Sequence, residues 1–254
     1  MPTQIFTSVV NRPGFLDLQA RLFEKHLTGD ATFNVVDDSV DGDVSSRFEE
    51  ICRVHGLNYI RKPRRVPGST PAEAAAEAIQ WTFDGIIRAR HDSDNVLFLD
   101  SDMFLVRDFD IDAYIDGYTI AGLLQQRGPI VYLWNGIMFF DMRAITAIGE
   151  PLDFSPGRVL GHPCDVGGQL YHYIHRADVR LRETDPGMEP AYPTEFRGVD
   201  LSGAAKDGYA FELHCDGHFL HYRAATNWFS NWRGTSDPLP RKAAIFERIV
   251  DAVL

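Results

Sequence analysis

The segment at residues 96–107, VLFLDSDMFLVR, constrains the fold of this chain more than any other part of it. Its four leading apolar residues predict a buried strand, and that strand runs directly into Asp100-Ser101-Asp102. Residues two apart in an extended chain point to the same side, so both carboxylates can face one point in space. Apolar residues return at 103–105, which favours a functional acid pair over a solvated turn. Open α/β sheets bind their ligands at such strand ends.

The two carboxylates need a counter-charge. When they are held side by side, Asp100 and Asp102 each disfavour the ionisation of the other. A divalent cation removes that conflict, and Mg²⁺ and Mn²⁺ prefer oxygen ligands, which they often share with substrate phosphates. We therefore expect a Mn²⁺ or Mg²⁺ site that takes up a substrate containing phosphate.

Strands and helices alternate in the first half of the chain. Apolar runs predict strands at residues 5–10, 33–36, 57–60 and 96–99. Helical patterns between them begin at Pro13, near Ser46 with Glu49 as its capping box, and at Thr70 with Pro71 and Glu73. This rhythm predicts βαβ units and a parallel sheet.

The second half has shorter connections, which indicate a mixed sheet. We expect strands at residues 119–124, 137–141 and 219–222, helices at 166–174 and 241–253, a loop at 151–164 and mostly irregular chain at 182–206. No linker separates two domains, and 254 residues with 44% hydrophobic content are enough for one core. The chain is therefore expected to form a single α/β domain.

Composition and missing motifs exclude several classes of protein. A formal net charge of −11 argues against non-specific nucleic-acid binding, which needs a basic surface. We expect neither a signal peptide nor a membrane span, because a strand-like run follows the first residues and no apolar stretch reaches about 18 residues. The three cysteines lack metal-type spacing, so we expect reduced thiols and a cytoplasmic protein. A nicotinamide or flavin site is disfavoured because no GxGxxG follows the first strand.

Three later segments accompany the DxD, in the order WNGIMFF at 134–140, DVGGQL at 165–170 and HYR at 221–223. A DxD that closes an apolar strand after a βαβα start, followed by these segments, resembles the GT-A nucleotide-sugar glycosyltransferases, and among them the glycogenin and bacterial galactosyltransferase group. The resemblance implies a Rossmann-like mixed sheet flanked by helices, in one GT-A domain over residues 1–254. Residues 1–125 would bind the nucleotide sugar and residues 126–254 the acceptor.

The activity implied by the resemblance is metal-dependent transfer of a sugar from a nucleoside-diphosphate sugar, with UDP-sugars favoured, to a glycan, lipid or protein acceptor. Asp100, Asp102 and His221 would bind Mn²⁺ or Mg²⁺. The mixture of imidazole and carboxylates suits Mn²⁺. Arg223 lies on the same side of its strand as His221 and could bind a phosphate. His218 is the alternative metal ligand.

Further candidates line the expected sugar pocket. Ser101 would contact the donor, and Asn135 and Gly136 would contact the sugar, because an amide can bond a hydroxyl and glycine permits close approach. The alternative for this pair is a bulge or a hairpin turn. Asp165 and Gln169 are the catalytic candidates. Asp165 would be the general base if the reaction inverts, and both would flank the reacting carbon if it retains. The alternative for Asp165 is a helix N-cap.

Asp37 and Asp38 end the second predicted strand, where an acid holds ribose hydroxyls in dinucleotide-binding folds. We expect a similar contact to the base or ribose of the donor, with a solvated turn or a helix cap as the equal alternative. Two other readings of the whole chain stay open, a metal-dependent DxD phosphatase and a module that binds nucleotide sugars without catalysis.

Overall fold

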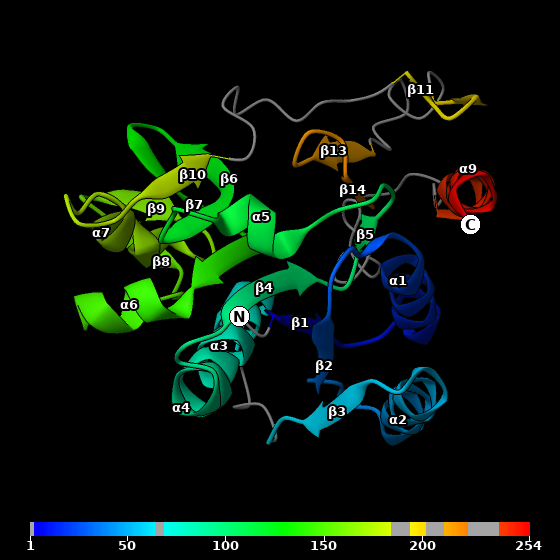
Figure 1. Ribbon diagram of the computed structural model, residues 1–254, viewed down its shortest axis with the longest axis horizontal. Helices are drawn as coiled ribbons and strands as arrows, with labels where there is room; N and C mark the ends of the chain where they lie inside the picture. Colours follow the sequence, from blue (N-terminus) through cyan, green and yellow to red (C-terminus); the bar gives the residue numbers. More distant parts are fainter. Residues whose placement is uncertain (1–2, 64–68, 184–193, 202–210, 223–238) are drawn as a thin grey trace.

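The computed structural model describes residues 3–63, 69–183, 194–201, 211–222 and 239–254. Its main element is a seven-stranded sheet with the order β10-β6-β7-β4-β1-β2-β3 (Figure 1). These strands are β1 (Thr3–Val9), β2 (Ala31–Asp37), β3 (Asn58–Arg61), β4 (Asn95–Asp100), β6 (Ile120–Arg127), β7 (Ile130–Asp141) and β10 (Leu181–Glu183). The prediction of a mixed α/β sheet flanked by helices is confirmed.

The sheet changes direction next to β4. Strand β1 pairs in parallel with β2 and β4, and β2 pairs in parallel with β3. Strand β7 instead runs antiparallel to both β4 and β6, and β10 pairs in parallel with β6. Because β1 and β7 flank β4, the acid pair leaves the sheet at its middle, where the parallel half meets the antiparallel strand.

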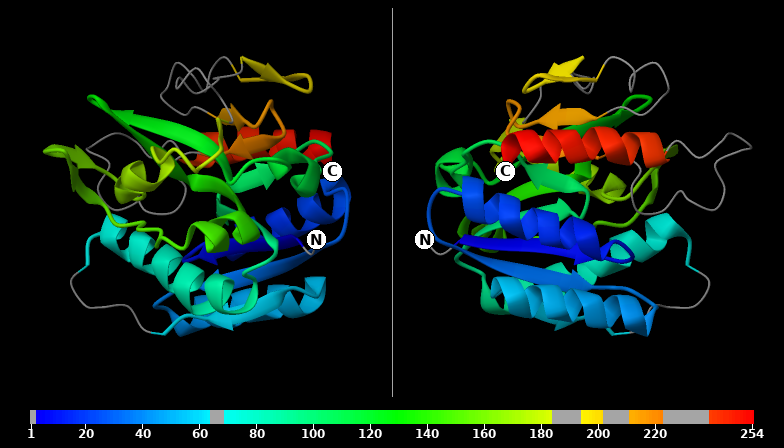
Figure 2. Two further views of the ribbon diagram at one scale, coloured as in Figure 1. Left: turned by 60° about the vertical axis from the view of Figure 1, so that its left-hand side comes forward. Right: turned by 90° about the vertical axis from the view of Figure 1, so that its right-hand side faces the viewer.

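Helices cover both faces of this sheet (Figures 1 and 2). The helical elements are α1 (Pro13–His26), α2 (Gly42–His55), α3 (Pro71–Thr82), the π-helical turn η1 (Phe83–Ile87), α4 (Arg88–Arg90), α5 (Ile111–Ile115), α6 (Met142–Ile148), the 3₁₀ turn η2 (Gly168–Leu170), α7 (Tyr171–Ile174) and α9 (Leu239–Val253). Of these, α9 packs away from this sheet. No helix in the described ranges is both long and apolar enough to cross a bilayer.

The two faces of β4 explain how the sequence builds the core. Val96 and Phe98 pack with Phe83 of η1 on one face, whereas Leu97 and Leu99 pack with α1 and α2 on the other. All four strand residues are at most 1% exposed. A strand apolar on both faces is typical of a sheet covered by helices on both sides.

One helix start was predicted correctly and another was not. Thr70 and Glu73 form the expected capping box of α3. Helix α2 begins earlier than expected, at Gly42, because the Asp41 side chain accepts hydrogen bonds from the backbone N–H groups of the first turn. The predicted capping box at Ser46 is therefore wrong, and the Ser46 hydroxyl bonds the Gly42 carbonyl inside the helix.

A second, three-stranded sheet joins distant parts of the chain. Its order is β13 (Glu212–His214), β14 (Phe219–His221) and β5 (Met103–Leu105), all antiparallel. Helices α1 and α9 lie against it, as the two side views show (Figure 2). Because β5 directly follows Asp102 and His221 is the last residue of β14, the pairing of β5 with β14 brings His221 next to the acid pair.

Two predicted irregular segments contain short hairpins. Strands β8 (Gly157–Val159) and β9 (His162–Cys164) pair within the expected loop at 151–164, and β11 (Glu195–Phe196) pairs with β12 (Val199–Asp200) within 182–206. These strands have two or three residues, too few to show a period in the sequence.

Candidate metal and donor site

The acid pair lies on a turn that α1 holds in place. Asp100 is the last residue of β4, and Asp102 follows in the turn with only 5% of its surface exposed. The Gln19 side chain, fully buried on α1, donates hydrogen bonds to the carbonyls of Asp100 (2.9 Å) and Met103 (2.8 Å). Gln19 thus fixes both ends of the turn. No prediction from the sequence included Gln19, although a glutamine on the apolar face of a helix is a usable signal.

The structure brings His221 to this turn. Its backbone is paired with Met103, and the backbone N–H of Tyr222 donates to the Asp102 carbonyl at 2.8 Å. His221 Nε2 consequently lies 3.6 Å from Asp102 Oδ1, with both side chains buried. Two ligands of one octahedral ion with bonds near 2.1 Å are separated by roughly 3–4 Å, so this pair needs little movement to share a metal.

Burial and neighbouring charges shift the pKa values of Asp100 and His221. Burial raises the pKa of the Asp100 carboxyl, and the charge of Asp102 adds to this effect, so that the pKa reaches about 7. For His221, burial alone lowers the pKa, but the charge of Asp102 and hydrogen bonds with Asp102 and Glu212 outweigh it and raise the pKa to about 9. His221 therefore carries a proton at neutral pH until a metal replaces it.

Two residues of β13 complete this cluster and were not singled out from the sequence. His221 Nδ1 lies 2.7 Å from Glu212 Oε2, and His214 Nε2 lies 3.5 Å from the same oxygen. All three side chains are buried, and their ligand-type atoms lie within 4.8 Å of one another. Nothing in the local sequence reveals this, because Glu212 reaches His221 only through the antiparallel pairing of β13 with β14.

Carboxylate oxygens and imidazole nitrogens from these residues fit a divalent transition-type cation. Asp102 and His221 face each other at 3.6 Å, and Asp100 stands beside them. The donor set thus matches Mn²⁺ better than Ca²⁺.

Trp134, Asn135 and Gly136 lie inside strand β7, not in a turn, so the hairpin-turn alternative is wrong. The register of β6 with β7 shifts between Gly122, which pairs with Met138, and Leu124, which pairs with Leu133, so the bulge alternative is confirmed for this segment. The Trp134 indole packs on the imidazoles of His221 and His214, with ring centroids 5.1 Å and 5.7 Å away. Within the described residues, no hydrogen bond occupies the partly buried Asn135 amide. Strand β7 therefore places the Trp134 ring against the histidines of the metal cluster and has a half-buried amide at the next residue.

Gly136→Ala is expected to displace the Trp134 indole, because a Cβ at this position would overlap the indole ring. Overpacking of this kind costs on the order of 1–3 kcal/mol of unfolding free energy. Urea unfolding and tryptophan fluorescence would measure the loss and the movement. Gly85→Ala is the matched control, since a Cβ there meets nothing within 4 Å, and it should not destabilise the protein. Equal stability of the two variants would contradict the packing described here.

Asp165 and Gln169 lie on the chain that follows the β8–β9 hairpin. Asp165 is exposed, its backbone N–H donates to the Tyr132 hydroxyl of β7 (3.0 Å), and its Oδ1 accepts from the next backbone N–H (2.9 Å). Gln169 Nε2 donates to the Arg158 carbonyl at 3.4 Å. No described distance tests whether either side chain reaches the metal cluster.

The expected helix at 166–174 is interrupted at its start. The 3₁₀ turn η2 runs directly into α7, so the expected helix is confirmed over residues 168–174, whereas Asp165 precedes it in loop conformation and its predicted N-cap is wrong. Gly167 has a φ of 83°, and a Cβ there would lie 2.6 Å from the Leu133 carbonyl oxygen. This close approach to β7 prevents a regular first turn.

Asp37 and Asp38 end β2 and are buried. Asp37 is bonded by Ser39, Ser45, Tyr59 and Arg61. Burial raises the pKa of Asp37, but hydrogen bonds from Ser45, Ser39 and Tyr59 outweigh it and hold the pKa below its ordinary value.

Asp38 Oδ1 lies 3.4 Å from Lys62 Nζ, which also lies 3.0 Å from Glu77 of α3. The solvated-turn alternative is wrong for both acids, because neither is exposed. Helix α2 is capped by Asp41, not by either of them. The expected contact to a ribose stays untested.

The remaining candidates are placed as follows. Ser101 is buried in the turn between the two acids. His218 lies at the other end of the β13–β14 hairpin, where its ring packs on Phe109 with centroids 5.2 Å apart. Arg223 lies outside the described residues, so the structure says nothing of its phosphate contact.

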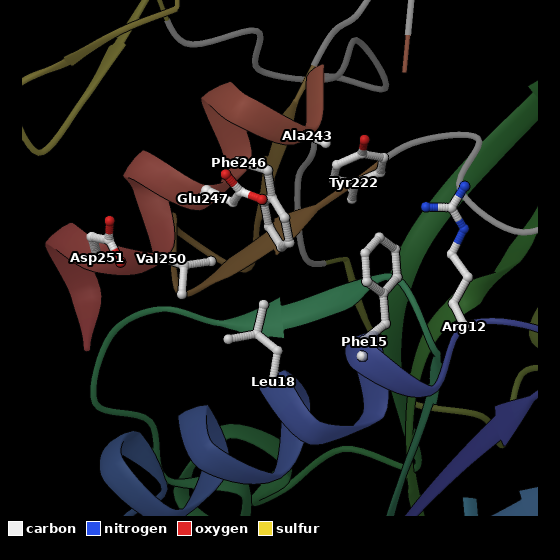
Figure 3. Close-up of a pocket in the computed structure, with 10 residues that line it drawn as sticks. Arg12, Phe15, Leu18, Tyr222, Ala243, Phe246, Glu247, Val250 and Asp251 are labelled. Carbon is white, nitrogen blue, oxygen red and sulfur yellow. The ribbon is translucent and has the colours of Figure 1, made fainter. Parts of the chain in front are cut away.

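A groove of about 300 Å³ lies between α1 and α9 (Figure 3). Phe15 and Leu18 of α1 face Phe246 and Val250 of α9 across it. Phe104, Leu220 and Tyr222 face these helices, whereas His221 alternates to the other side of the small sheet. The groove is therefore separate from the metal cluster.

No protein-family model matches the sequence, and no curated protein matches it either. Solved structures do match. The mannosyltransferase PcManGT from Pyrobaculum calidifontis, in complex with GDP-Man and Mn²⁺, is 14% identical, and the match covers 97% of this chain and 68% of that chain with a TM-score of 0.47. An active-site mutant of LgtC is 12% identical over 96% of this chain and 95% of that chain, with a TM-score of 0.45.

The galactosyltransferase LgtC, in complex with donor and acceptor sugar analogues, is 17% identical, and the match covers 55% of this chain and 58% of that chain with a TM-score of 0.40. The matched proteins are glycosyltransferases, the class that the sequence resembles. At these identities and TM-scores the similarity assigns no activity to this chain.

Proposed function

We propose that this chain is a metal-dependent glycosyltransferase that moves a sugar from a nucleoside-diphosphate sugar to an acceptor. The observation that carries the proposal is the 3.6 Å approach of His221 Nε2 to Asp102 Oδ1 at the carboxyl end of the central strand β4. Two ligand groups from opposite halves of the chain meet there, in a buried site. Ligands of open α/β sheets bind at this end of the strands.

Asp102, His221 and Asp100 would hold the cation, which we expect to be Mn²⁺ or Mg²⁺. When bound, the cation supplies a positive charge that stabilises the diphosphate as it leaves. Gln19 keeps the turn of the acid pair in one conformation through its two carbonyl contacts, so that the carboxylates need not reorganise during the reaction.

The other candidates would bind and orient the donor. Ser101 lies in the same turn, and the Asn135 amide, next to Gly136, is available to bond a sugar hydroxyl. Asp38 and Asp37 would bound the nucleoside from the end of β2. Because Asp37 is already bonded to four neighbours, we propose that it shapes the β2–α2 turn and that Asp38 makes the closer contact.

Asp165 and Gln169 would face the reacting sugar from the β8–β9 side, with Arg223 on a phosphate. If the reaction inverts the anomeric centre, the exposed Asp165 carboxylate takes the proton of the acceptor hydroxyl. If the reaction retains it, Asp165 and Gln169 flank the sugar without that role. UDP-sugars are the first donors to test, and the acceptor is a glycan, lipid or protein.

A donor screen tests the proposal. The chain is incubated with UDP- and GDP-sugars and Mn²⁺, and release of free nucleoside diphosphate is measured. We expect turnover with one donor and its loss in EDTA, since the acid pair needs a counter-charge before a diphosphate can approach. Calorimetry with the same donor should show the same dependence.

Other outcomes point to the alternatives. Binding of a donor without turnover would favour a non-catalytic module. Release of orthophosphate from phosphomonoesters, without release from sugar nucleotides, would favour a phosphatase. Equal donor affinity with and without EDTA would contradict the metal site.

A further inference from the structure

Glu212 contacts the proposed metal ligand on the side away from the acid pair. The imidazole of His221 has two nitrogens, and they face different carboxylates. Nε2 lies 3.6 Å from Asp102 Oδ1, whereas Nδ1 lies 2.7 Å from Glu212 Oε2. The second distance is that of a good hydrogen bond, and the first is that of two groups able to share an ion. Nδ1 is therefore the nitrogen that bonds Glu212, and Nε2 is the nitrogen that faces the proposed ion.

An ionised carboxylate can only accept hydrogen bonds, so Nδ1 must carry the hydrogen in its bond with Glu212. The lone pair of a neutral ring then lies on Nε2, the nitrogen that faces Asp102. The Trp134 indole packs on the same ring at 5.1 Å between centroids and restricts its rotation. The carboxylate thus selects the one tautomer and ring orientation able to bind a metal beside Asp102.

We infer that Glu212 is a positioning residue for the metal site, which holds His221 with Nε2 directed at the ion. The inference rests on the proposed function, because it concerns the metal that the glycosyltransferase site would bind. His214 Nε2 also lies 3.5 Å from the same carboxylate oxygen. The strands β13 and β14 therefore supply a metal ligand and the group that orients it.

The experiment measures Mn²⁺ binding alone, on the full chain, by calorimetry and by the loss of the free Mn²⁺ electron-paramagnetic-resonance signal. We expect His221→Gln to remove most of the affinity and Glu212→Gln to reduce it by about 10–100-fold. The glutamine keeps the size of the side chain but can donate to Nδ1, and this stabilises the tautomer unable to bind metal. His214→Gln should cost clearly less than Glu212→Gln, because His214 touches the carboxylate and not the ion.

His218→Gln is the matched control, since it removes a histidine of the same hairpin that packs on Phe109 instead. It should bind Mn²⁺ like the wild type. Circular dichroism and thermal unfolding identify any variant that fails to fold.

A second measurement needs no variant. The ¹⁵N shifts of the His221 ring in the Mg²⁺-loaded wild type should show a protonated Nδ1 and a metal-bound Nε2. The opposite tautomer would overturn the inference, and so would wild-type affinity in Glu212→Gln or an equal loss in His214→Gln and His221→Gln. If the wild type binds no Mn²⁺, the proposed function fails together with the inference. If His221→Gln loses binding while Glu212→Gln does not, only the inference fails.

Discussion

Asp102→Asn is expected to lower turnover by at least about 10²-fold while the protein stays folded. The asparagine retains the shape of the side chain but loses the charge that faces His221. The backbone carbonyl of residue 102 still accepts from Tyr222, so the junction of β5 with β14 is preserved. Removal of the charge also relieves the repulsion that helps to raise the pKa of Asp100. Nucleoside-diphosphate release, measured with circular dichroism and thermal unfolding, checks the result.

Asp116→Asn is a suitable control because this acid is exposed beyond α5 and belongs to no proposed site. It should leave turnover unchanged. If Asp102→Asn kept wild-type turnover with an unchanged melting temperature, the acid pair would be structural, and the buried approach of His221 would need another explanation.

Mn²⁺ affinity is expected to fall as the pH is lowered from about 9, and to fall more steeply below about 7. A metal must displace the proton of His221 before it can bind. Burial of the ring lowers the pKa of His221, but the charge of Asp102 and the hydrogen bonds with Asp102 and Glu212 outweigh it and raise the pKa to about 9. Burial and the charge of Asp102 raise the pKa of Asp100 to about 7, so this carboxylate begins to compete there. Each displaced proton lowers the affinity about tenfold per pH unit.

The pH range over which the Mn²⁺ affinity falls distinguishes His221 from a histidine with an ordinary pKa. An unperturbed imidazole has a pKa of 6.5, and its competition would begin only below that value. Calorimetry from pH 6 to pH 8.5 would measure the slope, and buffers of different ionisation enthalpy would count the released protons. His221→Gln should flatten the profile between pH 7 and 8.5, whereas His218→Gln should not. A flat wild-type profile above pH 6.5 would contradict the raised pKa of His221.

Much of the parallel half could be predicted because its signals are local. Strand β4 is apolar on both faces, and the capping residues of α3 stand three apart in the sequence. The start of α2 was missed because Asp41 competes with Ser46 as a cap, and propensity alone does not decide between them. The hairpins β8–β9 and β11–β12 were missed because strands of two or three residues carry no period.

The candidate site likewise has features that local sequence patterns predict and features that depend on contacts between distant segments. The sequence by itself determined that a buried strand ends in two acids and that a late histidine lies on an apolar strand, since both facts follow from residues close together. Only the tertiary structure decided that β14 pairs with β5, that Glu212 thereby reaches His221, and that Gln19 bonds both ends of the acid turn. The physical reason is that pairing between distant strands depends on how the whole core packs, and no local pattern of residues records that choice.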